Sequence, residues 1–108
     1  MTTFDRRRDG FEKKFALDEE QKFKALVRRN KLLGLWAAEK MGLAGTEAAD
    51  YAKEVVKADF SEPGEEDVFR KIKEDFAAKG VDQSEHQIRR TMDELMATAA
   101  QQIQNSEA

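Results

Sequence analysis

Several residue types that carry chemistry or staple small folds are missing or rare in this sequence. Its 108 residues include no Cys, one Pro and one His. Without Cys there is no disulfide framework and no thiol chemistry, and His86 has no second His with which to build a metal site. β-branched residues are scarce, so a sheet is not expected. These absences favour an all-α fold with His86 as a surface residue.

Long apolar runs are absent too. No stretch approaches the ~18 apolar residues that a membrane span needs. The first ten residues, MTTFDRRRDG, contain no apolar core of a signal peptide. We therefore predict no membrane insertion and a cytoplasmic location, and we expect a monomer when the chain is free.

The charges are abundant and unevenly distributed. Residues 1–36 carry ten Lys and Arg against six Asp and Glu, a net of +4, whereas residues 37–108 carry nine against sixteen, a net of −7. A basic N-terminal part on an acidic body suggests a partner that is acidic where this part docks. The basic residues alternate with acidic ones and the pI is about 5.3, so we do not expect nucleic acid to be that partner.

The stretch from residue 22 to residue 41 organises the rest of the chain. Its apolar residues recur every three or four positions, which is the period of one helix face. Asp18 with Gln21 fits a capping box at its start, and Gly42 fits a left-handed cap at its end. Gly34 in the interior suggests close approach of another backbone, and we expect Trp36 to be largely buried. The apolar stripe comprises Phe23, Leu26, Val27, Leu33, Ala37 and Met41, with the polar Asn30 in the same line.

Three more helices follow with short loops. The second runs to about Ala58 with Thr46 as its expected N-cap, and the third ends at Gly80. The fourth begins with a capping box formed either by Asp82 with Glu85 or by Ser84 with Gln87. We predict an all-α four-helix bundle over residues 18–108 that is preceded by a flexible segment over residues 1–17.

The N-terminal segment carries three phenylalanines at helical spacing. Phe11 and Phe15 each fall within roughly 20° of Phe4 on a helix, but Gly10 interrupts it. We expect the segment to be frayed when free and helical when a partner covers the rings. The alternative is that it folds back on the bundle as a hydrophobic strap.

Two charged clusters leave a choice of interpretation. The run at residues 28–31, RRNK, is either a solvated face or a phosphate-binding collar. The acidic cluster at residues 65–67 is better explained by a helix start, where negative charge is favourable, than by a metal site. No Gly-rich phosphate loop and no nucleophile–base pair is recognisable, so we predict that the protein is not an enzyme.

Two longer motifs resemble a known family. Residues 28–38, RRNKLLGLWAA, and residues 62–72, EPGEEDVFRKI, look like signatures of the zeta subunit, the inhibitor subunit of the F-type ATP synthase in α-proteobacteria. Residues 84–89, SEHQIR, form a weaker third block. The resemblance extends over essentially the whole chain.

The resemblance implies an inhibitor that blocks ATP hydrolysis. In that family the N-terminal segment enters a catalytic interface between the α and β subunits and contacts the central stalk, which contains γ. The protein would then be peripheral to the inner membrane through the synthase. Weak ATP or ADP binding is a further implication, and a small nucleotide-binding regulatory bundle is the alternative function. The residues expected to bind the partner are Phe4, Arg6, Arg7, Phe11, Lys13, Lys14 and Phe15; those expected to contact nucleotide are Arg28, Arg29 and Lys31.

Overall fold

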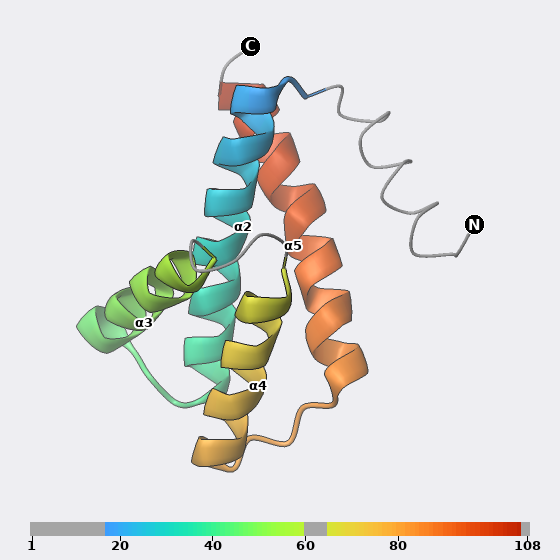
Figure 1. Cartoon of the computed structure of the whole chain (residues 1–108). Coiled ribbons are helices and arrows are strands. Elements are labelled where there is room, and N and C mark those ends of the chain that lie inside the picture. The colour runs from blue at the N-terminus through green and yellow to red at the C-terminus, as the bar shows by residue number, and fades with distance from the viewer. Residues whose placement is uncertain (1–16, 60–64, 107–108) are drawn as a thin grey trace.

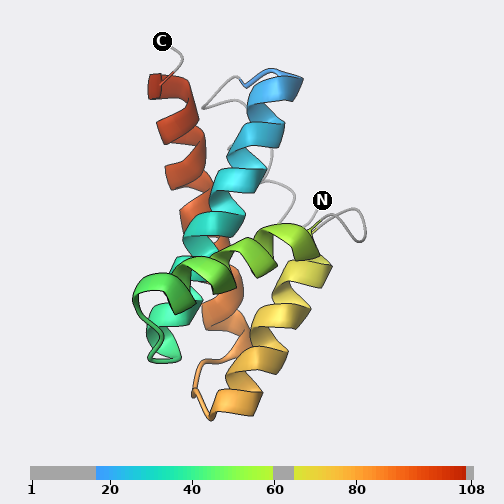
Figure 2. The ribbon, with the colours of Figure 1, turned by 90° about the vertical axis from the view of Figure 1, so that its left-hand side faces the viewer.

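The computed structural model describes residues 17–59 and 65–106, and this part of the chain contains four helices and no strand. The helices are α2 (Glu19–Lys40), α3 (Gly45–Ala58), α4 (Glu66–Lys79) and α5 (Glu85–Ser106). The two long helices, α2 and α5, lie side by side and antiparallel, while α3 crosses α2 and α4 lies against one half of the pair (Figures 1 and 2). Helix α2 contacts each of the other three. The predicted all-α four-helix fold and the predicted central position of the stretch at residues 22–41 are confirmed.

Both ends of α2 are closed as predicted. The backbone N–H of Gln21 donates to the Asp18 carboxylate at 2.8 Å, and the Gln21 side chain accepts from the Asp18 N–H at 3.2 Å, which completes the capping box. At the other end Gly42 adopts φ 78°. The N–H of Leu43 then donates to the Ala38 carbonyl at 2.8 Å, as in a left-handed helix cap.

Of the three caps predicted for the other helices, two are present in the structure. Gly80, with φ 70°, ends α4, and the Ser84–Gln87 pair forms the capping box of α5. The prediction of Thr46 as the N-cap of α3 is wrong. The N-cap is Ala44, whose side chain makes no capping hydrogen bond, because an alanine has no oxygen to offer.

The core divides into a large cluster and a small one. The large cluster fills the space between the C-terminal half of α2 and the three other helices. It includes Leu33, Val55, Ile72, Phe76 and Met92. The small cluster lies between the first turns of α2 and the last turns of α5. It consists of Leu17, Ala25, Ala100 and Ile103. Leu17, which we had assigned to the N-terminal segment, is thus part of the bundle.

Helices α2 and α3 make their closest approach at Gly34. A Cβ at this position would lie 2.6 Å from the Ala52 Cα and 3.3 Å from the Val55 Cβ. Only a residue without a side chain fits such a crossing, and the predicted close approach of another backbone at Gly34 is confirmed. A glycine in a helix interior costs about 1 kcal/mol relative to alanine, and here the contact of two helices explains its presence.

The apolar stripe of α2 is covered along only part of its length. The first turns of α2 extend beyond α3 and α4, and among the described helices only α5 lies beside them (Figure 1). Phe23 is consequently 56% exposed and Leu26 37%, so the first part of the stripe is not buried in a core. Trp36 is partly buried and packs against the large cluster, with its ring centroid 5.6 Å from that of Phe76.

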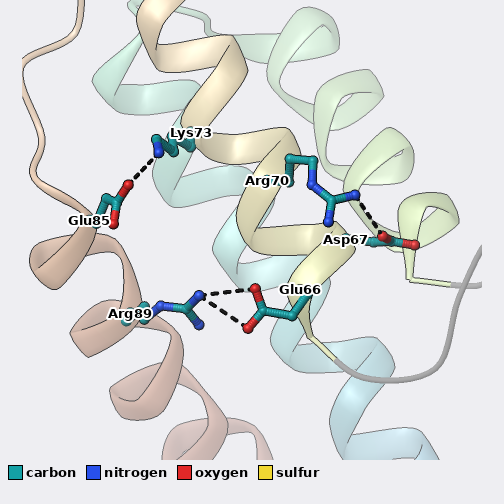
Figure 3. A network of polar contacts seen from close by, with 6 residues as sticks. All are labelled: Glu66, Asp67, Arg70, Lys73, Glu85 and Arg89. Carbon is teal, nitrogen blue, oxygen red and sulfur yellow. Dashed lines mark hydrogen bonds and ion pairs between the residues drawn. The ribbon is translucent and has the colours of Figure 1, made fainter.

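Ion pairs join α4 to α5 along their exposed edge (Figure 3). The guanidinium of Arg89 donates to both carboxylate oxygens of Glu66 at 3.1 Å and lies 3.9 Å from the centre of the Phe69 ring. Lys73 pairs with Glu85 farther along the same edge. Exposed pairs of this kind contribute up to about 1 kcal/mol each, so they align the two helices more than they hold them.

Candidate functional site

The seven residues predicted to bind the ATP synthase all lie within residues 1–16, outside the described residues. The structure does show where this segment joins the bundle. Leu17 is buried against Ala25, Ala100 and Ile103, so the junction lies where α2 begins beside the last turns of α5. The assignment of the seven residues to a partner stays a prediction.

The three residues predicted to contact nucleotide do not share one surface. Arg28 is exposed and donates a hydrogen bond to Gln102 of α5 at 3.2 Å. Lys31 is exposed on the same helix. Arg29, in contrast, is 2% exposed, so it is not available to a ligand at the surface. The nucleotide assignment as a whole stays a prediction, and Arg28 and Lys31 are its accessible members.

Two members of the RRNK run at residues 28–31, Arg29 and Asn30, belong to a buried polar group. The Nε of Arg29 donates to the Oδ1 of Asn30 at 2.8 Å, and its Nη1 lies 3.3 Å from the Glu65 carboxylate at the start of α4. Asn30 is 1% exposed, and its Nδ2 has no hydrogen-bond partner among residues 17–59 and 65–106. Burying a charge is costly unless it is paired. The Arg29–Glu65 pair therefore acts as a polar tie between the middle of α2 and the start of α4.

The acidic cluster at the start of α4 is accounted for by arginines. Glu65 pairs with Arg29. Glu66 pairs with Arg89, and Asp67 pairs with Arg70 at 3.3 Å (Figure 3). No group of three or more potential metal ligands occurs among residues 17–59 and 65–106. The interpretation of this cluster as a helix start is consistent with the position of Glu66 and Asp67 in the first turn of α4.

A second polar group ties α3 to α4. The Tyr51 hydroxyl donates to the Asp75 carboxylate at 2.7 Å, and Lys71 donates to the same carboxylate at 3.0 Å. Burial raises the pKa of the Tyr51 phenol far above its usual value, and the hydrogen bond and the negative charge of Asp75 raise it further. This phenol therefore stays neutral and serves as a structural donor.

Sequence reasoning missed the burial of Arg29, although the sequence contained a signal for it. Arg29 lies four residues after Ala25 and four before Leu33, both of which are buried. Positions four apart share one helix face. The line that contains Arg29 therefore faces the bundle, and the acidic partner that burial requires had to come from another helix.

The described helices and their ends can now be compared with known proteins. None of these helices is long and apolar enough to cross a membrane. A solved structure, described as a solution NMR structure of a protein, is 50% identical in sequence with a TM-score of 0.69, and the match covers 78% of this chain and 95% of that one. No curated protein matches.

The family comparison covers nearly the whole chain. A family model described as ATPase inhibitor subunit zeta matches residues 1–102. The match includes the N-terminal segment and extends into the last turns of α5, and it agrees with the resemblance found in the sequence motifs. It supports a role as an inhibitor of the ATP synthase. The chain belongs to the ATPase inhibitor subunit zeta family.

Proposed function

We propose that this protein inhibits ATP hydrolysis by the F-type ATP synthase and that its residues 1–16 enter an interface between the α and β subunits near the central stalk. The observation that carries the proposal is the family match, which spans residues 1–102 and so includes the segment. In this role the protein is a regulatory subunit without catalytic activity of its own.

The construction of the bundle supports separate roles for the helices and for the N-terminal segment. The caps of α2 and α5 and the large core cluster are formed by residues downstream of position 17. The described core clusters are thus made of residues from position 17 onward. This supports separate roles for the segment and the bundle.

The chemistry of the segment suits a protein interface with acidic surroundings. Phe4, Phe11 and Phe15 each offer roughly 2 kcal/mol when fully buried in a partner, and Arg6 and Lys13 offer charge to acidic surfaces. Fixing the backbone of the segment costs about 1–2 kcal/mol per residue, so three rings alone cannot hold it. Additional contacts by the bundle, which raise the local concentration of the segment, are needed.

Deletion of residues 1–15 tests the proposal. The truncated protein should keep the helical circular dichroism of the full chain and should no longer inhibit ATP hydrolysis by the purified synthase. In the full chain, the double variant Phe11→Ala and Phe15→Ala should weaken inhibition severely, and high salt should weaken it moderately. If the truncated protein inhibits as well as the full chain, the inhibitory surface lies on the bundle and the proposal is wrong.

A further inference from the structure

The side chain of Arg28 differs from those of the other arginines that the structure describes. The others each pair with a carboxylate of the same chain; they are Arg29, Arg70, Arg89 and Arg90. Arg28 is exposed and forms no ion pair with residues 17–59 and 65–106. The chain has 22 Asp and Glu against 19 Lys and Arg, so a shortage of acidic residues does not explain this. The guanidinium of Arg28 therefore keeps N–H donors for an acceptor outside the chain.

Arg28 begins a short line of exposed side chains on α2. Lys31 follows Arg28 by three residues and Leu35 follows Lys31 by four, so the three lie on one helix face. Lys31 is exposed and likewise has no ion pair within the described part of the chain, and Leu35 is 38% exposed. We call the surface formed by Arg28, Lys31 and Leu35 the outer α2 face. It spans about 10 Å along the helix axis.

The outer α2 face is held in place by the helices on its two sides. On one side the Nη1 of Arg28 donates to the Oε1 of Gln102 at 3.2 Å, which positions the guanidinium beside α5. On the other side α3 crosses α2 at Gly34, next to Leu35 (Figure 2). The face thus belongs to a packed part of the bundle. A partner that binds here does not have to order the backbone, which lowers the cost of binding.

We infer that the outer α2 face docks onto an acidic surface of the ATP synthase, one that presents carboxylates to the two cations and an apolar side chain to Leu35. This inference rests on the proposed function, which requires the bundle to make contacts of its own. Two cations without carboxylates of their own chain attract a surface that carries Asp and Glu. Leu35 favours a protein surface over a phosphate group, because apolar contact beside charged contact is typical of protein interfaces.

Reversal of the two charges tests the electrostatic part of the inference. In the full chain, Arg28→Glu with Lys31→Glu turns two attractions into repulsions and should raise the half-inhibitory concentration for ATP hydrolysis about tenfold. This loss should shrink at high salt, because exposed charges are screened within about 10 Å at 0.1 M. The matched control is Lys57→Glu with Lys79→Glu, which makes the same change in net charge at exposed lysines in the last turns of α3 and α4. The control should change the half-inhibitory concentration less than about twofold, since specific contacts and not net charge set the affinity.

Leu35→Gln tests the apolar part. It should raise the half-inhibitory concentration about threefold or more, because it removes apolar area that the partner covers. This rise should persist at high salt, since an apolar contact is not screened as charges are. Inhibition at saturating concentration should stay complete for every variant, because the N-terminal segment is unchanged. Circular dichroism and thermal unfolding verify that each variant is folded.

Each other outcome overturns the inference in a recognisable way. If the unchanged protein inhibits and the charge reversal at residues 28 and 31 has no effect, the face is not a docking surface, while the proposed function stands. If that reversal weakens inhibition but Leu35→Gln does not, the face is a charge site alone and the assignment to a docked protein surface is wrong. An equal loss in the control variant would mean that net charge governs the association and not this face. If the unchanged protein does not inhibit, the proposed function fails and this inference fails with it.

Discussion

Gly34→Ala should destabilise the protein even though alanine is the better helix former. In an exposed helix the change would stabilise by about 1 kcal/mol. At Gly34 the new methyl group would lie 2.6 Å from the Ala52 Cα and 3.1 Å from the Ala52 Cβ, whereas carbon atoms prefer separations of about 3.5–4.0 Å. The nearest atom is main chain, so no rotamer change can relieve the contact and α3 as a whole must move away from α2.

The size of the effect follows from these two terms. Overpacking costs typically about 1–3 kcal/mol, and a clash with main chain belongs at the upper end of that range. After the gain in helix propensity, we expect a net loss of about 2 kcal/mol, which for a domain of this size lowers the Tm by about 10 °C. Urea unfolding should show a lower midpoint with an unchanged slope.

A second variant makes this prediction sharper. Ala52→Gly combined with Gly34→Ala removes the Cβ contact but leaves the Ala52 Cα in place, so the double variant should not recover the stability lost by Gly34→Ala. Recovery would mean that the side chain of Ala52, and not its backbone, sets the spacing of the helices. If Gly34→Ala alone raises the urea midpoint, as helix propensity alone would require, the packing argument is refuted.

Three further predictions address the polar contacts. Arg29→Met should lower the free energy of unfolding, measured in urea, by about 3 kcal/mol because it removes the buried partner of Glu65. Arg29→Met combined with Glu65→Leu should recover most of that loss. Equal stability of the single variant and the unchanged protein would contradict the role of the pair. The raised pKa of Tyr51 stabilises the fold at pH values below the ordinary phenol pKa of about 10, and this stabilisation is lost as the pH rises above that value. Tyr51→Phe should therefore flatten the alkaline limb of a curve of stability against pH. An unchanged alkaline limb would count against this role of Tyr51. If ATP binds at residues 28–31, its NMR shift changes should appear at the exposed Arg28 and Lys31, spare the buried Arg29 side chain and shrink with salt; shifts that map elsewhere or resist salt would refute this site.

The local features of the fold could be predicted from the sequence because they depend on neighbouring residues. The Asp18–Gln21 box, the Gly42 and Gly80 caps and the Ser84–Gln87 box each involve residues within a few positions of one another. Gly34 was informative for a similar reason, because a glycine in an apolar helix has few explanations other than close packing. Ala44 could not be found in this way, since its side chain cannot cap a helix.

The features that the sequence could not predict depend on which helix covers which part of α2. Periodicity places Phe23, Leu26 and Leu33 on one stripe, but it does not say that α3 and α4 cover only the lower half of that stripe. For the candidate site, the sequence indicated the segment and the family, whereas the division between an exposed Arg28 and a buried Arg29 required the tertiary structure.

The Arg29–Glu65 pair lies at the border between the covered and the uncovered part of α2. Leu26 is three residues before Arg29, and Leu33 is four residues after it; the first is exposed and the second is fully buried. An apolar contact at this point would stabilise the bundle at least as well, because buried ion pairs rarely exceed a hydrophobic replacement in stability. An ion pair differs in having a fixed position. It connects the start of α4 to one turn of α2. The polar tie thus lies at the point where the core of the bundle ends.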